Sequence, residues 1–214
     1  MAIEIISLKC PKCSSPLSGF ENDWIFFCPV CSLGWDFSGS KPESIPVSYA
    51  RAKIQLEKSP RIFYLPFYLF QVSIQITDAK YLQKVKKWVD SLKRIYLAGF
   101  RLIRESYFGD LGFIYTESMV ELEPDANVPE KQRAKIGAVV RTPKELEKYL
   151  ILYPSLILDK RADITGIKIQ VDSHLERIWA VPFFDLGEKV QEGILGKTFP
   201  SFALEEIEEF RKIP

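Results

Sequence analysis

The sequence has a single histidine, His174, among its 214 residues, and it lacks the short motifs of common hydrolytic and nucleotide chemistry. There is no G-x-S-x-G elbow, no glycine-rich phosphate loop and no H-E-x-x-H motif. The carboxylates are scattered at positions of surface type, so the sequence selects no pair for acid–base catalysis. The sequence does not decide whether the protein is an enzyme, but it favours a non-enzymatic one with His174 in a surface turn.

Long hydrophobic runs are also absent. The longest, Ile62–Phe70, has nine residues and contains a proline, whereas a membrane-spanning helix needs about 20. No charged leader with an apolar segment precedes Cys10, so we expect no signal peptide and no membrane partner. With cysteines in reduced form, the expected location is the cytoplasm.

The chain has almost no net charge, because 29 basic residues balance 28 acidic ones to give +1. Residues 1–46 are acidic, and four metal-bound thiolates would make them more so, which disfavours nucleic-acid binding by this part alone. Residues 79–104 are strongly basic, and Trp88 or Tyr96 could stack on a base. A surface for an anionic partner such as nucleic acid is predicted there, formed by Lys80, Lys84, Lys87, Arg94, Arg101 and Arg104.

The cysteines number four, and all lie in two C-P-x-C pairs, Cys10/Cys13 and Cys28/Cys31, with fourteen residues between the pairs. In each pair a tight turn can direct both sulfurs to one point, and proline after the first cysteine presets the turn. Two such turns can supply four thiolates to one tetrahedral ion. The spacing therefore predicts a metal site formed by all four cysteines.

Short aromatic strands are expected around the second pair, at Trp24–Phe27 and Gly34–Phe37. With them, residues 8–37 resemble a zinc ribbon, a broad family found in transcription factors, ribosomal proteins, enzymes and adaptors. The resemblance implies structural Zn²⁺. Many ribbons have glycine after the second cysteine of each pair, where this chain has Ser14 and Ser32.

Two alternatives to zinc stay open for the four cysteines. Iron in the same sulfur cage would make a rubredoxin-like electron carrier. The cysteines could instead form a redox pair or disulfides, although two pairs without secretory features favour a metal.

We predict an α+β protein, with the zinc ribbon at residues 1–40 followed by a mixed, mainly antiparallel β-domain at 47–214 with two or three packed helices. Residues 38–46 have the composition of a linker between the two. In the larger domain, alternating polarity predicts a strand over 49–56, and residues 61–76 predict a second strand that begins buried on both faces.

A similar pattern returns later in the chain, with Lys-Ile-Gln, Arg-Ile and Pro-Phe at matching positions. We therefore predict an internal duplication of a β-hairpin, at 49–76 and 164–184. Pro66 and Pro182 stand at matching positions and should lie at a sheet edge or a bulge. The aromatic residues after them, Phe67 and Phe183, should point into the core; the alternative is that they line an apolar groove for a partner.

The remaining elements follow from periodicity and capping residues. We expect a helix over 78–88, although a strand-like echo leaves the type of 78–92 open, and then strands over 94–104 and 113–122. Thr142 should cap a helix that Pro154 ends. Ser201 should cap a last helix that directs Phe202, Ile207 and Phe210 inward.

Three function classes are consistent with these features. The favoured one is a non-enzymatic interaction or assembly protein with a structural metal and another protein as its partner. The second is nucleic-acid binding through residues 79–104, and the third is an iron electron carrier.

Overall fold

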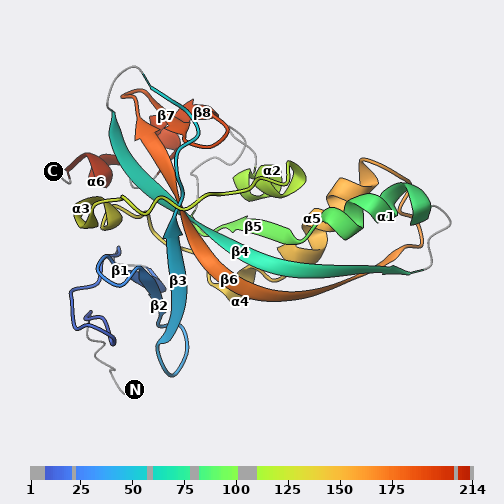
Figure 1. The fold of residues 1–214 in the computed structure, drawn as a ribbon, viewed down its shortest axis with the longest axis horizontal. Coiled ribbons are helices and arrows are strands. Elements are labelled where there is room, and N and C mark those ends of the chain that lie inside the picture. The colour runs from blue at the N-terminus through green and yellow to red at the C-terminus, as the bar shows by residue number, and fades with distance from the viewer. Residues whose placement is uncertain are drawn as a thin grey trace.

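A computed structural model describes residues 8–20, 23–56, 60–77, 82–100, 110–204 and 207–212, without the side chains of 82–84 and 209. The strands are β1 (Ile25–Cys28), β2 (Leu33–Asp36), β3 (Glu43–Tyr49), β4 (Arg61–Thr77), β5 (Arg94–Ala98), β6 (Lys168–Asp185), β7 (Lys189–Glu192) and β8 (Thr198–Pro200). The helices are α1 (Leu82–Ser91), α2 (Leu111–Glu117), α3 (Glu130–Arg133), α4 (Pro143–Leu146), α5 (Tyr149–Asp159) and α6 (Ile207–Lys212). The chain is thus a mixed α+β protein with a mostly antiparallel sheet (Figure 1).

The two longest strands, β4 and β6, form the centre of the sheet. They pair antiparallel from Arg61 opposite Asp185 to Thr77 opposite Lys168, and together they cross the whole molecule (Figure 1). Among the described residues the strand order is β1-β2-β3-β6-β4-β5, and β7 and β8 extend from β6. Beyond β5 the pair continues as a two-stranded arm, on which α1 and α5 lie.

Side chains of β4 alternate between two cores, one on each face of the central pair. Phe63, Leu65 and Phe67 pack with α2, α6 and β7, while Tyr64 and Tyr68 pack with β1, β3 and α5. Alternation along a strand places neighbours on opposite faces, so residues 63–70 are all buried. The expected doubly buried strand is confirmed, and its outer end is half-exposed as predicted.

The two similar stretches lie against each other. Leu65 and Val181, at matching positions of the two stretches, are paired directly across β4 and β6. The second stretch does not form the expected hairpin, because 168–185 is one continuous strand. His174 therefore lies in an exposed part of β6 rather than in a turn, and the register shifts beside Glu176 instead. Duplication itself stays a prediction.

Pro66 and Pro182 lie where a neighbouring strand stops. The pairing of β5 with β4 ends beside Pro66, whose carbonyl accepts a hydrogen bond from Gly99 at 2.9 Å. The pairing of β7 with β6 ends beside Pro182, whose carbonyl accepts from Gly193 at 2.9 Å. Since N and O of one strand residue point to the same side, the missing N–H of each proline faces the ending strand. The two prolines therefore remove no hydrogen bond between β4 and β6.

The prediction of a strand over 49–56 is wrong in its position. The observed strand, β3, begins at Glu43, inside the expected linker, and ends at Tyr49. Residues 51–56 alternate in exposure but are not a strand. They follow a different hydrogen-bonding path, in which Arg51 N donates to Glu123 O at 2.8 Å and Lys53 N donates to Gly193 O at 2.8 Å.

The strand expected over 113–122 is a helix, α2, in its first part. Asp110 caps it, and Gly112 lets it approach β5, because a Cβ there would lie 2.5 Å from the carbonyl oxygen of Tyr96. Thr116 Oγ then accepts a hydrogen bond from Tyr96 N at 3.0 Å. This tertiary contact satisfies a backbone group at the sheet edge and overrides the local β pattern.

Most of the expected helices are present. Residues 82–91 are helical, 94–98 form a strand, and Thr142 forms a capping box with Glu145. Residues 78–81 and 101–104 lie outside the described residues. Pro154 does not end its helix, which runs on to Asp159, because buried side chains on both sides of it offset the roughly 3 kcal/mol cost of an internal proline.

The C-terminal prediction is partly wrong. Residues 201–203 form a 3₁₀ turn, and the described part of the last helix is 207–212. Phe202 is 60% exposed instead of buried. Ile207 and Phe210 point into the core as predicted.

Candidate metal centre

The four cysteines lie on two turns of similar shape. In the first, Ser14 N donates to the carbonyl of Cys10 at 2.8 Å; in the second, Ser32 N donates to the carbonyl of Cys28 at 3.0 Å. Both serines have left-handed backbone conformation, with φ of 60° and 53°. Glycine adopts this conformation most easily, which accounts for the preference for glycine at the corresponding positions of zinc ribbons. Cys31 N also donates to Cys28 Sγ at 3.3 Å.

The sulfur atoms of the four cysteines converge. All four Sγ atoms lie within 4.8 Å of one another, and those of Cys13 and Cys28 are 3.6 Å apart. A tetrahedral thiolate site with bonds of about 2.3 Å places its sulfurs about 3.8 Å apart. The tetrad can therefore hold a metal ion, as the spacing predicted. Within the described ranges, no other cluster of three or more His, Cys, Asp or Glu side chains could do so.

The four sulfur atoms lie close enough to affect one another's pKa. Hydrogen bonds to Ser15 lower the pKa of Cys13 to about 6, which favours its thiolate form. The hydrogen bond with Cys13 raises the pKa of Cys31 to about 12, and burial raises the pKa of Cys28. Close sulfurs resist becoming thiolates together unless a cation offsets their charge. The cluster thus suits a metal cation.

The cysteine-bearing segment is attached to the sheet through strand β3. Strand β2 pairs with β1 on one side and with the first half of β3 on the other, and the second half of β3 pairs parallel with β6. Ile25 and Phe27 of β1 are fully buried in the same core as the even-numbered face of β4. We call residues 8–36 the cysteine module.

Asp23, which lies between the two cysteine pairs, attaches the cysteine module to the rest of the protein at a second point. Its carboxylate is 8% exposed and accepts hydrogen bonds from Phe20 N at 2.6 Å and from Val139 N at 2.9 Å. Burial raises the pKa of Asp23 to about 6, against the lowering effect of these two amides. No local sequence pattern indicates this role, because the partner Val139 is 116 positions away.

Other contacts fix the module against the core at two further points. The ring of Phe20 lies edge-on to that of Phe210 of α6, with centroids 5.9 Å apart. Arg133 Nη1 lies 3.4 Å from Ser32 Oγ, and the carbonyl of Arg133 accepts from the hydroxyl of Tyr49 at 2.8 Å. The turn that carries the second cysteine pair is therefore tied to α3 and β3.

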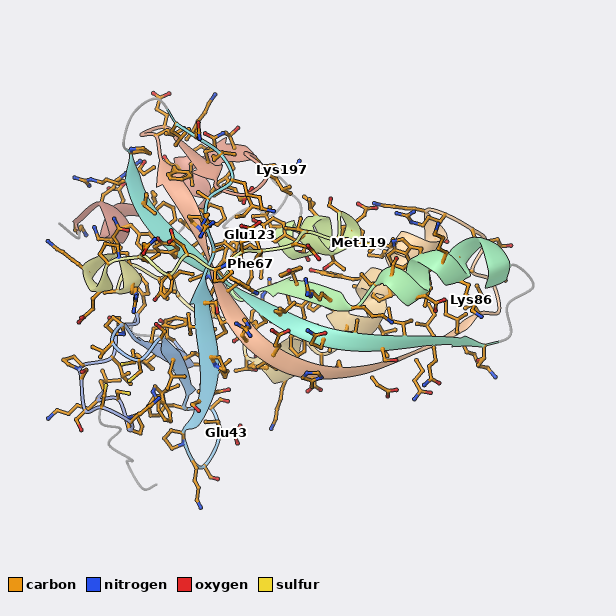
Figure 2. The ribbon with its side chains drawn as sticks, viewed as in Figure 1. Glu43, Phe67, Lys86, Met119, Glu123 and Lys197 are labelled. Carbon is orange, nitrogen blue, oxygen red and sulfur yellow. The ribbon has the colours of Figure 1, made fainter. Side chains whose placement is uncertain are left out.

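The predicted basic surface is only partly described. Lys80, Arg101 and Arg104 lie outside the described residues, as does the side chain of Lys84. Lys87 is exposed on α1, and Figure 2 shows its neighbour Lys86 far from the cysteine module. Arg94 forms an exposed ion pair with Glu121 at 3.5 Å. Binding of an anionic partner here stays a prediction.

Buried ionisable groups away from the cysteines have structural partners. Glu192 is fully buried and accepts hydrogen bonds from Ile194 N at 2.5 Å and Leu195 N at 2.7 Å. The hydroxyl of Tyr115, also fully buried, donates to the same carboxylate at 2.5 Å. Burial raises the pKa values of both Glu192 and Tyr115.

The helices of the described part include none that is both long and apolar enough to span a bilayer. Phe67 and Phe183 are fully buried, which confirms their core position and contradicts the groove alternative. Figure 2 shows Phe67 near the point where β3, β4 and β6 cross. No protein-family model, no curated protein and no solved structure matches the chain.

Proposed function

We propose that this chain is a non-enzymatic zinc-ribbon protein, in which one structural Zn²⁺ fixes the cysteine module and the protein acts by binding another protein. The observation that carries the metal part is the convergence of four Sγ atoms within 4.8 Å. Four thiolates fill a tetrahedral site and leave no position for water or substrate, which is the usual arrangement of a structural zinc.

The surroundings of the cage support a structural role. The module's strands continue the main sheet through β3, and Asp23 is committed to two backbone amides. The buried carboxylates that the structure describes, Asp23 and Glu192, are both held by backbone N–H groups. Because these amides already use their oxygens, the two carboxylates support a role in holding the fold together.

The binding part of the proposal rests on exposed apolar side chains of the module. Leu8, Trp24 and Val30 are 51%, 47% and 47% exposed. Exposed tryptophan is enriched among the anchors of protein interfaces, and Val30 lies in the turn of the second cysteine pair, where a bound metal would fix its position.

Metal analysis of the native chain tests the metal part. We expect one zinc per chain and no visible absorbance, whereas one iron per chain and a red colour would establish the electron-carrier alternative. A Cys13→Ser/Cys31→Ser variant should lose the metal.

Quantitative comparison of co-purifying proteins tests the binding part. A Trp24→Ser/Val30→Ser variant should keep its zinc but lose a protein that the wild type retains. The matched control is Leu186→Ser, 46% exposed and outside the module. Loss of the same protein from the control, or no loss from the module variant, would remove the module as the binding surface.

A further inference from the structure

Helix α5 is apolar on nearly all sides. Its buried side chains, among them Leu150, Tyr153 and Leu158, pack on the sheet. On the opposite side, Ile151, Leu152 and Leu156 are 50%, 43% and 44% exposed. A surface helix usually presents polar residues to water, so this exposed apolar stripe requires an explanation.

The stripe follows the helical repeat and has charges at its two ends. Its members occupy positions i, i+3, i+4, i+7, i+8 and i+11 of the helix: Lys148, Ile151, Leu152, Ser155, Leu156 and Asp159. Such spacing places them along one face over about 16 Å. Ser155, the smallest side chain, lies near the midline, where it permits close approach of another helix.

The terminal charges are opposite to those that suit the helix itself. Lys148 is at the N-terminal end, where the helix dipole is positive, and Asp159 is at the C-terminal end, where it is negative. Each charge is unfavourable in its own helix. Each becomes favourable next to a helix that runs in the opposite direction.

We propose that α5 is the contact face of a homodimer, in which α5 of one copy packs antiparallel on α5 of a second copy about a two-fold axis. Lys148 of each copy then lies beside Asp159 of the other, and Leu152 of each packs against Leu156 of the other. The stripe is complementary to itself in this arrangement alone, because parallel helices would place like charges together.

A lipid surface fits the stripe less well. Membrane-bound amphipathic helices carry basic residues along the polar margins, whereas here Asp159 lies on the line of the stripe. The dimer does not depend on the metal, because α5 packs on β6, α2 and β5 rather than on the cysteine module (Figure 1).

The contact is small, so the dimer should exchange with monomer. A single pair of helices of this length buries less than the roughly 800 Å² per partner of a standard interface. We therefore expect the sedimentation coefficient to rise from the monomer toward the dimer value between about 1 and about 200 µM protein, since mass action governs assembly.

Sedimentation velocity of three proteins tests the location of the contact. Leu152→Glu should sediment as a monomer throughout this range. Leu186→Glu, the same change at a leucine that is 46% exposed elsewhere, should behave as the wild type. Matching circular dichroism and melting temperatures exclude unfolding. A wild type that stays monomeric, or a dimer that survives Leu152→Glu, would overturn the proposal.

Charge exchange tests the antiparallel orientation. Lys148→Glu and Asp159→Lys should each raise the dissociation constant about tenfold, because each creates two like-charge contacts. The double variant, and an equimolar mixture of the two single variants, should return to within about threefold of the wild-type value. A double variant weaker than both single variants would contradict the antiparallel pair.

Discussion

The carboxylate of Asp23 joins the cysteine module to the core by accepting a hydrogen bond from Val139 N at 2.9 Å. The same carboxylate accepts from Phe20 N within the module at 2.6 Å. One buried side chain thus satisfies a backbone amide on each side of the junction.

Replacing Asp23 with alanine should loosen this junction. Both amides lose a charged acceptor, and a buried N–H without a partner costs about 1–3 kcal/mol. Hydrogen exchange at the amides of Phe20 and Val139 should be about tenfold faster or more. Asp36→Ala is the control, because Asp36 accepts a hydrogen bond from Ser38 N at an exposed turn. Equal exchange rates in wild type and Asp23→Ala would contradict the role of the carboxylate.

Stability should depend on pH through Asp23. Its pKa is raised from 3.8 to about 6 in the folded state, so between these values the folded state keeps a proton that the unfolded state releases. The free energy of unfolding therefore falls as the pH rises through this window. The full effect is about 3 kcal/mol, from a shift of roughly two pKa units.

Asp23→Asn removes this titration. Urea unfolding of both proteins in excess zinc between about pH 4 and 7 gives their stability difference at each pH. Wild-type stability should decline relative to that of the variant as the pH rises. A difference that stays constant would show that Asp23 titrates alike in both states.

Removal of the metal should unfold the cysteine module and leave the central sheet folded. Small metal-bound modules obtain much of their folding free energy from the ion. After chelation, amide protection should vanish over residues 8–36 and persist across the β4–β6 pairs. Lys12→Ala, in the same turn as Cys10 and Cys13, should retain both zinc and protection. Unchanged protection without metal would show that the module folds on its own.

Replacing Phe67 or Phe183 with alanine should strongly destabilise the protein. Phe67 and Phe183 are fully buried, and removing a buried phenylalanine ring costs roughly 3–5 kcal/mol. Leu186→Ala, at a side chain 46% exposed, should cost less than about 0.5 kcal/mol. The free energies of unfolding by urea measure all three. A cost below about 1 kcal/mol for Phe67→Ala or Phe183→Ala would refute their core role.

Gly99 and Gly193 donate hydrogen bonds to the carbonyls of Pro66 and Pro182. The two glycines should differ in how well they tolerate replacement by alanine. A Cβ at Gly193 would lie 2.7 Å from the carbonyl oxygen of Pro182, whereas one at Gly99 would lie 3.2 Å from the ring of Tyr68. Gly193→Ala must therefore displace backbone and should lower the melting temperature more than Gly99→Ala. Gly39→Ala, with its nearest neighbour atom 3.7 Å away, serves as the control. The reverse order would contradict the observed packing.

The sequence was sufficient to predict features that depend on local spacing. The sulfur cluster follows from two turns of fixed geometry, and the capping box of Thr142 follows from three neighbouring residues. The strand at 61–77 follows from a run that is apolar on both faces. Each of these signals is contained within a few turns or strand repeats of chain.

Features that depend on distant partners could not be predicted. Helix α2 has a strand-like sequence, but the contact of Gly112 and Thr116 with β5 decides its conformation. The polar run 172–174 resembles a turn, yet it pairs with 71–73 of β4, where β5 begins and the arm starts. Asp23 obtains its role from Val139, and no local pattern connects the two.

Strand β3 covers part of one edge of β6. Along one side of β6, β3 covers residues 178–180 and β7 covers 183–185. A shortened chain that begins after Tyr49 would leave N–H and C=O groups of the apolar stretch Ile178–Ala180 without partners. Such an exposed sheet edge can pair with strands of other molecules and so promote aggregation. Strand β3, which follows the cysteine module in the chain, thus also shields the apolar residues Ile178–Ala180 of β6.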